Sequence, residues 1–460
     1  MRQELIKENK IEAYFPADRL PVFFICISLV FLFVGLLFGV LSGFQYIFPD
    51  WLRNIFPFTR MRTLHVSLVI SWIFTASTGG IYYFVQDYLR KPLFSPRLAW
   101  SHLALLVFVS SCTFVNYFLG KFGGREYLEF PAWIGLPIIA YWILFMINYF
   151  KTISGSFSNA PVYVWMWATG LIFFLITFLE SQLWLLDFFG GTIIRDTTVQ
   201  WKALGSMVGS WNMLVYGTAF YIMEKIIVDT KVAQSRQTFF FYFLGLTNLM
   251  FNWGHHTYIV PASPWIKHIS YFISMTELLI LANIIREWRL SFRKAKINFH
   301  IIPYRFLTAA DLWIFLNLIL AIAMSVPAIN AYTHGTHITV AHAMGTTIGI
   351  NSMILFAALT FIANKIEFLN MKRIEKWMLS GYWVVNVSLM IFWLALLIAG
   401  AIMSGMKDLK THQEIMLSLS PLFRLVATTG LILLLGFSML IFPLLKLYLK
   451  KIFDKMNVVS

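Results

Sequence analysis

The residues best suited to chemistry in this sequence are histidines that lie within or beside long apolar runs. Six of the ten histidines occur in three such runs, far apart in the chain: His65, His255, His256, His334, His337 and His342. Ionisable side chains are costly inside a membrane and are usually kept there for a function. Imidazole is the commonest metal ligand of proteins and an axial ligand of haem iron. The pattern predicts a shared haem or metal site built by three separate parts of the chain.

The last of these runs places two candidate iron ligands two residues apart. Positions i and i+2 of an α-helix point about 200° apart, so His342 and Met344 face opposite sides of one helix. That helix could ligate two haems, one on each flank. Methionine is an axial haem ligand in some cytochromes, where a His/Met pair raises the reduction potential. Because the chain has 20 methionines, packing in the core is the alternative role for Met344.

The surrounding sequence is too apolar for a soluble protein. Of its 460 residues, 59% are hydrophobic and 12% are charged, whereas soluble domains are about 25% charged. An apolar helix of about 20 residues crosses a hydrocarbon core of roughly 30 Å. The sequence predicts an all-α membrane protein with twelve transmembrane helices, at about residues 21–46, 61–87, 97–120, 131–150, 162–186, 203–228, 237–259, 264–287, 308–330, 333–363, 375–405 and 419–449.

Lysine and arginine predict how these helices are oriented. They are dense on one side of the predicted membrane, in loops 88–96, 229–236, 288–307 and 364–374 and in the carboxyl-terminal tail. Cytoplasmic loops carry the excess of positive charge, so both termini are expected to be cytoplasmic. The six histidines then lie at one depth near the outer face. The predicted parts are a cytoplasmic lead at 1–20, a single haem-binding transmembrane domain at 21–449 and a basic cytoplasmic tail at 450–460.

Other features of the sequence narrow the function. The net charge of +15 is explained by the loops that set topology, so no binding of nucleic acid is expected. Cys26 and Cys112 lie in apolar runs and no CxxCH motif occurs, which excludes a covalently attached c-type haem. Glu180, inside the fifth run, is expected to be protonated or partnered. The remaining histidines lie in loops or near helix ends, where bonds to solvent or backbone are expected: His102, His268, His300 and His412.

The order of these motifs resembles subunit I of the haem-copper oxidase superfamily. A histidine opens the second predicted helix, a His-His pair ends the seventh, and the segment 333–337 (Thr-His-Gly-Thr-His) leads to His342. Within the superfamily the chain most resembles the catalytic, large subunit of bacterial nitric oxide reductase, whose motif is similar to residues 124–129 (Gly-Arg-Glu-Tyr-Leu-Glu). The resemblance covers most of the chain. It implies a twelve-helix bundle of this type, multi-pass in the bacterial inner membrane.

The resemblance implies a role for each matched residue. His65 would be an axial ligand of a low-spin haem b, and His342 the proximal ligand of a high-spin haem of the b3 type. His255 and His256 would ligate a non-haem iron or copper that faces this second haem. Glu277 matches a glutamate near the catalytic site and is a candidate for proton delivery.

Two further pairs are candidate binding residues. Glu126 and Glu129 fall where the family holds calcium near the haem propionates, and a solvated loop is the alternative. His334 and His337 lie at the depth of the other histidines and are candidates for cofactor binding.

The sequence departs from the family at three positions. Met344 stands where the family has the second histidine ligand of the low-spin haem. Either the methionine takes the place of that ligand, or the haem is five-coordinate, or it is missing. The third metal-binding histidine of the family falls at Leu204. The two glutamates of nitric oxide reductases fall at Val208 and Asn212. Three outcomes remain for the non-haem site. It holds copper or iron, with Asn212, Tyr258 or water completing the set of ligands; it holds no metal; or it is altered for other chemistry.

The expected function is that of a membrane-bound haem oxidoreductase acting on nitric oxide, a small gas that crosses the lipid bilayer. Reduction to nitrous oxide would take electrons from a membrane-anchored cytochrome c subunit, a quinol or another donor. Dismutation, which needs no net electrons, is a variant that the altered metal site favours. The alternatives are a terminal oxygen reductase like cytochrome c oxidase, and a haem protein for electron transfer or gas sensing without turnover.

Overall fold

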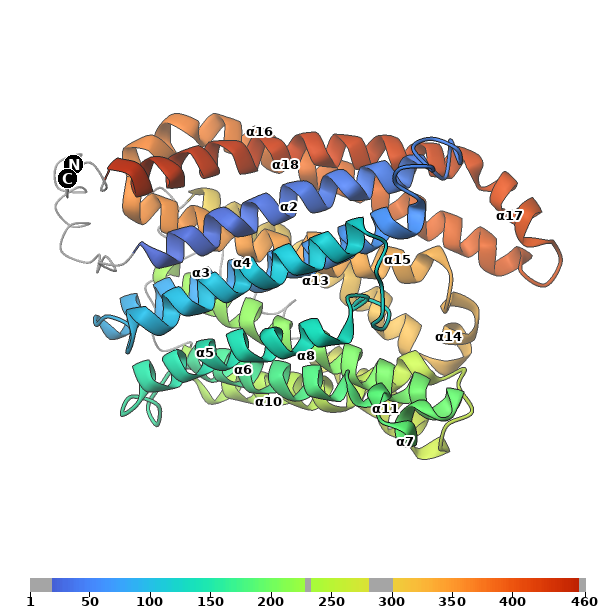
Figure 1. Ribbon diagram of the computed structural model, residues 1–460, viewed down its shortest axis with the longest axis horizontal. Helices are drawn as coiled ribbons and strands as arrows, with labels where there is room; N and C mark the ends of the chain where they lie inside the picture. The colour runs from blue at the N-terminus through green and yellow to red at the C-terminus, as the bar shows by residue number, and fades with distance from the viewer. Residues whose placement is uncertain (1–18, 228–232, 281–300, 455–460) are drawn as a thin grey trace.

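The chain folds into a bundle of long helices that run side by side (Figure 1). The computed structural model describes residues 19–227, 233–280 and 301–454, and this part of the chain contains no β-strand. The longer helices are α2 (Leu20–Phe44), α3 (Phe58–Leu89), α4 (Pro96–Phe118), α5 (Gly135–Ile153), α6 (Val162–Glu180), α8 (Ile193–Ile227), α10 (Arg236–Phe251), α11 (Pro264–Met275), α13 (Ile301–Ser325), α16 (Met353–Met406) and α18 (Ser420–Asp454). Short elements join them: η1 (Ala132–Ile134), η2 (Leu183–Leu185), α7 (Asp187–Gly190), η3 (Asn252–Thr257), α14 (Pro327–Thr333), α15 (His337–Met344), the π-helix η4 (Gly345–Ser352) and α17 (His412–Ser418).

Eight helical segments of the described chain are long and apolar enough to cross a membrane. One of them, His337–Met406, has 70 residues, which is about 105 Å of helix where one crossing needs roughly 30 Å. Its backbone leaves the helical conformation at Glu367 (φ −146°, ψ 53°). Beyond this kink the helix runs back antiparallel, because Asn386 lies beside Met353 and Gly400 beside Ile338. The protein is therefore a multi-pass membrane protein, while the count of twelve crossings stays a prediction.

The start of α8 differs from the predicted start of the sixth helix. The helix begins at Ile193 rather than near 203. The added turns contain charged residues, of which Asp196 is paired with Arg125 at 2.5 Å and Lys202 is paired with Glu180. Because each charge has a partner, the helix continues through them. Glu180 is thus partnered, one of the two states expected for it.

The two ends of the bundle differ in what they carry. Nη1 of Arg19, just before α2, donates a hydrogen bond of 3.1 Å to the carbonyl of Ile452 near the end of α18. Figure 1 shows the start of α2 and the end of α18 together at the left. The opposite end, the histidine end, holds the start of α3 together with η3, α14 and α15. The cytoplasmic position of the termini stays a prediction.

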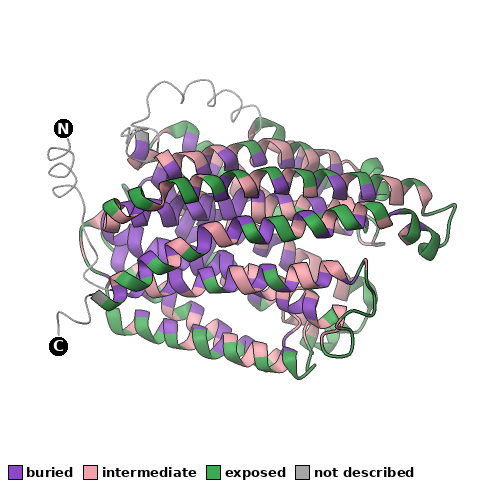
Figure 2. Cartoon of the chain, turned by 90° about the horizontal axis from the view of Figure 1, so that it is seen from above, coloured by how far each residue is buried: buried purple, intermediate pink, exposed green. Residues whose placement is uncertain are grey.

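The core is tighter away from the histidine end. In α3 every residue from Trp72 to Asp87 is buried, whereas most residues from 62 to 71 are half-buried. The same change occurs along the tenth predicted helix, where 349–364 are all buried and most of 337–348 are not. Figure 2 shows buried residues gathered in the half of the bundle that holds the chain ends. Both segments therefore keep accessible surface at the level of their histidines.

Candidate functional site

His65 lies in the second turn of α3, against the neighbouring helix α2. Its Nδ1 is 2.8 Å from the carbonyl oxygen of Gly35. A carbonyl only accepts hydrogen bonds, so Nδ1 carries the proton and Nε2 has the free lone pair. Gly39 lets the ring approach, because a Cβ built there would be 2.6 Å from Nδ1 of His65. The contacts with Gly35 and Gly39 thus hold His65 in one tautomer, in which Nε2 is free to bind a ligand.

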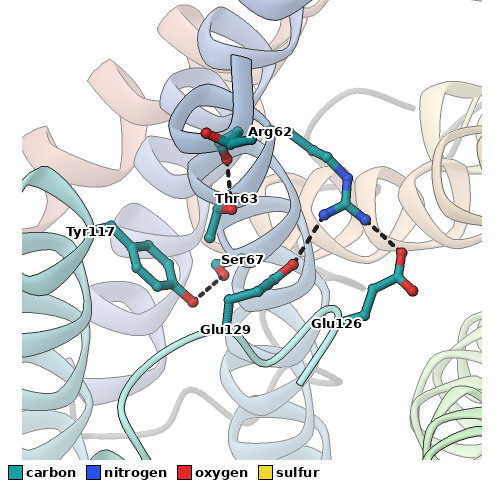
Figure 3. A network of polar contacts seen from close by, with 7 residues as sticks. Arg62, Thr63, Ser67, Tyr117, Glu126 and Glu129 are labelled. Atoms are coloured by element: carbon teal, nitrogen blue, oxygen red, sulfur yellow. Dashed lines mark hydrogen bonds and ion pairs between the residues drawn. The ribbon is translucent and has the colours of Figure 1, made fainter. Parts of the chain in front are cut away.

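Arg62, one helical turn before His65, joins α3 to the loop that follows α4 (Figure 3). Its Nη2 donates to Glu126 at 2.7 Å and its Nη1 donates to Glu129 at 3.1 Å. The guanidinium carbon also lies 5.8 Å from the centre of the Tyr127 ring. A calcium ion between the two carboxylates would have to compete with this internal cation. Calcium binding by Glu126 and Glu129 stays a prediction.

Glu129 supplies a pH-dependent element to this loop. Burial raises the pKa of Glu129 above its ordinary value, and the nearby Arg62 counteracts part of that rise. The proton is therefore bound more tightly in the folded state. The stability that it adds is fully present below the unfolded pKa and is lost as pH rises through the folded pKa.

We expect this titration to change the reduction potential of the low-spin haem that the family resemblance assigns to His65. As pH falls through the raised pKa of Glu129, a negative charge is lost and the potential should rise, by at most about 59 mV per pH unit for one proton per electron. Glu129→Gln should remove this slope in redox titrations of the low-spin haem. Glu375→Gln, in α16 beyond the kink at Glu367, is the control and should keep it. An unchanged slope in Glu129→Gln would contradict the assignment.

The His255–His256 pair lies in η3, a 3₁₀ turn that continues α10. Their ring centres are 4.2 Å apart. Nδ1 of His255 is 2.9 Å from Oδ1 of Asn252, whose Nδ2 donates to Oε1 of Glu277 at 2.8 Å. His256 stacks on the indole of Trp201, with ring centres 5.0 Å apart and planes 13° from parallel. Both rings are therefore held from the side by other residues.

The segment after α14 separates the three remaining histidines. His334 caps α14, and Gly335 turns the chain with φ +73°, a conformation that favours glycine. His337 starts α15 and packs against Phe423, with ring centres 5.1 Å apart. His342 lies near the end of α15, and its Nδ1 is buried with no hydrogen-bond partner in the described chain.

The structure brings four of the six predicted histidines together. His255 and His256 lie within electrostatic range of both His334 and His342. The charged group that acts on His65 is Arg62, and none of these four histidines acts on it. His337 packs against Phe423 of α18 and is not part of this group. The arrangement fits one cofactor position beside His65 and another beside the four-histidine group.

Helix α8 faces the histidine pair without a histidine or a carboxylate at the three positions where the family has them, Leu204, Val208 and Asn212. At Gly205 a Cβ would lie 2.7 Å from Cβ of Trp253 and 3.6 Å from Cδ2 of His256, so the helix passes close to η3. Leu204 is only 7% exposed and is apolar. Oδ1 of Asn212 is buried with no partner among the described residues. The family's third histidine thus has no replacement on this face of α8.

One histidine was assigned wrongly from the sequence, and several supporting residues were missed. His102 is not near solvent: it is 1% exposed in α4, where its Nδ1 lies 3.0 Å from the hydroxyl of Tyr82. Arg62, Trp201 and Asn252 support the candidate site but are common residue types without a recognisable spacing. His268 and His412 are exposed as expected, and His300 lies outside the described residues.

The side chains at the histidine end fit a porphyrin better than they fit a non-haem iron. His65 has a free Nε2, His342 has an unpartnered buried nitrogen, and the helices that carry them keep accessible surface at this level. For the second metal, no three or more His, Cys, Asp or Glu side chains of the described chain are placed so that together they could hold a metal ion. Two neutral imidazoles without a carboxylate suit copper better than ferrous iron.

The fold and the sequence define the class of protein. A family model, cytochrome c and quinol oxidase polypeptide I, matches residues 19–433, and the chain belongs to this family of membrane haem proteins. A solved haem-copper terminal oxidase dimer has a similar fold, with a TM-score of 0.66 at 15% identity over 93% of this chain and 84% of that one.

Curated relatives include reductases and oxidases. A nitric oxide reductase chain of Stutzerimonas stutzeri is 24% identical over 407 residues, 81% of each chain. A cytochrome c oxidase subunit 1 homologue of Agrobacterium tumefaciens (strain T37) is also 24% identical over 407 residues, 80% of this chain and 70% of its own. A cbb3-type cytochrome c oxidase chain, CcoN1 of S. stutzeri, is 22% identical over 364 residues, 75% of this chain and 74% of its own. Membership of the family supports the assignment of this protein as an oxidoreductase. The relatives include both a nitric oxide reductase and cytochrome c oxidases.

Proposed function

We propose that this protein is a haem oxidoreductase of the bacterial inner membrane that acts on nitric oxide. The observation that carries the proposal is the four-histidine group, with Glu277 joined to His255 through Asn252 and no third metal ligand from α8. Similarity to the nitric oxide reductase of S. stutzeri over 81% of the chain supports the same substrate. The electron donor in this proposal is a membrane-anchored cytochrome c subunit or a quinol.

The residues have distinct tasks in this proposal. His65 and Met344 hold a low-spin haem b, and His342 holds a high-spin haem; when bound, these haems supply electron transfer and the iron that receives the gas. The His255–His256 pair lines the opposite side of the substrate space and holds a second metal, for which copper is favoured. Reduction of two NO to N2O and water takes two electrons and two protons, and the Glu277 carboxyl, which is linked to His255 through Asn252, is a candidate to carry a proton to this space.

An anaerobic assay on purified, haem-loaded protein tests the proposal. With a reduced cytochrome c or quinol donor, NO consumption with N2O formation indicates reductase activity. Consumption without a donor, yielding N2 and O2, indicates dismutation, which the missing ligands on α8 favour. A protein that consumes no NO under either condition would contradict the proposal. Oxygen uptake with the same donors would point instead to an oxidase, the activity named for the Agrobacterium relative.

Met344 is expected to control the low-spin haem. Met344→His should restore a bis-histidine pair and lower the reduction potential, because methionine stabilises ferrous haem more than histidine does. Met344→Ala should leave that haem five-coordinate and change its spectrum from low-spin to high-spin. Optical and EPR spectra of the reduced and oxidised proteins measure both changes. Spectra that stay unchanged in Met344→Ala would show that the thioether packs in the core and does not bind iron.

A further inference from the structure

Asn252 forms a hydrogen-bonded link between Glu277 and His255. Its Nδ2 is 2.8 Å from Oε1 of Glu277, and its Oδ1 is 2.9 Å from Nδ1 of His255. The hydroxyl of Ser274 donates to the same Oδ1. The three partners come from η3, from α11 and from the helical residues 277–280 that follow α11.

These contacts determine which nitrogen of His255 is free. A carboxylate accepts and an amide nitrogen donates, so Glu277 selects the amide orientation in which Nδ2 points toward it. The amide oxygen then faces His255 and accepts from its Nδ1. With the proton held on Nδ1, Nε2 keeps the lone pair that a metal requires.

The backbone around this link is also fixed. Nδ2 of Asn330 donates to the carbonyl of His255 at 3.2 Å, and the hydroxyl of Ser270 donates to the carbonyl of Asn252 at 3.0 Å. A Cβ on Gly254 would lie 2.8 Å from Cβ of Ser270, so η3 and α11 are in close contact. The imidazole is therefore presented from a turn that is tied on two sides.

We infer that Glu277 and Asn252 are positioning residues, which fix the tautomer and direction of His255 for metal binding. Glu277 acts through Asn252, and this task needs a hydrogen-bond acceptor rather than a transferable proton. Residues of this kind typically change metal affinity by about 10- to 100-fold when they are replaced. The inference rests on the proposed role of the His255–His256 pair as metal ligands.

Two substitutions at one position separate positioning from proton transfer. Glu277→Gln keeps an oxygen that accepts from Asn252, whereas Glu277→Leu removes it. Full-length, haem-loaded protein would be stripped of adventitious metal and titrated with copper, with EPR of the bound Cu(II) as the readout. Glu277→Leu and Asn252→Leu should weaken copper binding by about 10- to 100-fold, and Glu277→Gln should stay within about threefold of the unmodified protein.

A nearby asparagine provides the control. Asn248 lies one turn before Asn252 on α10 and donates to Thr276 at 3.4 Å, but no hydrogen bond joins it to a histidine of the described chain. Asn248→Leu should leave copper binding unchanged. Equal losses in Glu277→Gln and Glu277→Leu, or unchanged binding in both leucine variants at positions 252 and 277, would overturn the inference.

A second measurement does not depend on the metal. In protein labelled with ¹⁵N-histidine, the signal assigned to His255 by its loss in His255→Gln should show a protonated Nδ1. Asn252→Leu should remove this preference, and Glu277→Gln should preserve it. If the unmodified protein bound no copper, the metal assignment in the proposed function would fail, and the tautomer measurement would still decide the role of Asn252 and Glu277.

Discussion

Replacing His342 by alanine is expected to remove the high-spin haem and bring turnover to background. Its Nδ1 is buried and unpartnered among the described residues, and the ring lies within range of the His255–His256 pair. No neighbouring side chain on α15 offers a second imidazole in its place, because His337 is occupied with Phe423 on α18. The iron of that haem would thus lose its only proposed protein ligand.

Haem content and carbon monoxide binding measure this effect. The variant should retain about half of the haem, because the proposed function assigns the other haem to His65 and Met344, and should lose the spectrum of the CO adduct. His412→Ala, at an exposed position on α17, is the matched control and should keep both haems. Retention of both haems and of CO binding in His342→Ala would show that another residue is the proximal ligand.

A methyl group on Gly39 is expected to displace His65 and empty the low-spin site. A Cβ there would lie 2.6 Å from Nδ1 and 2.8 Å from Cε1 of His65, distances that real Cβ atoms do not reach. The ring has little freedom to yield, since Gly35 holds its Nδ1. Overpacking of this kind costs about 1–3 kcal/mol. Gly39→Ala should therefore lose the low-spin haem spectrum and unfold at a lower temperature.

Gly43, one helical turn further along α2, is a matched control. No atom lies within 4 Å of a Cβ built at this position. Gly43→Ala should keep both haems and be neutral or more stable by up to about 1 kcal/mol, because alanine favours helix more than glycine does. Equal haem spectra in the Gly39→Ala and Gly43→Ala proteins would contradict the placement of His65 against α2.

The sequence was informative where a residue type is rare in its surroundings. Charged or ionisable groups are few in the apolar runs, so His65, the His255–His256 pair and His342 could be picked out before the helices were placed. The predicted start of the sixth helix, near residue 203, was wrong. Asp196 and Lys202 each have a salt-bridge partner, and α8 begins before both, at Ile193.

Residues that act through geometry could not be found in this way. Asn252 and Trp201 belong to types that occur throughout the chain, and only the 3₁₀ turn of η3 brings them to the two histidines. The buried setting of His102 was likewise hidden, because the ring of Tyr141 that stacks on it comes from α5, in a distant part of the sequence. Conversely, the kink at Glu367 was anticipated. It lies within residues 364–374, which were predicted to be a loop because of their lysines and arginine.

The close passage of α8 past η3 also limits which substitutions could add a third imidazole to the histidine pair. A side chain at Gly205 would collide with Trp253, and position 201 is filled by the indole stacked on His256. A histidine at either position would require the two elements to move apart or the stacked indole to be lost. Protein engineering of a three-histidine centre is thus expected to succeed first at position 204, where the family has its third histidine.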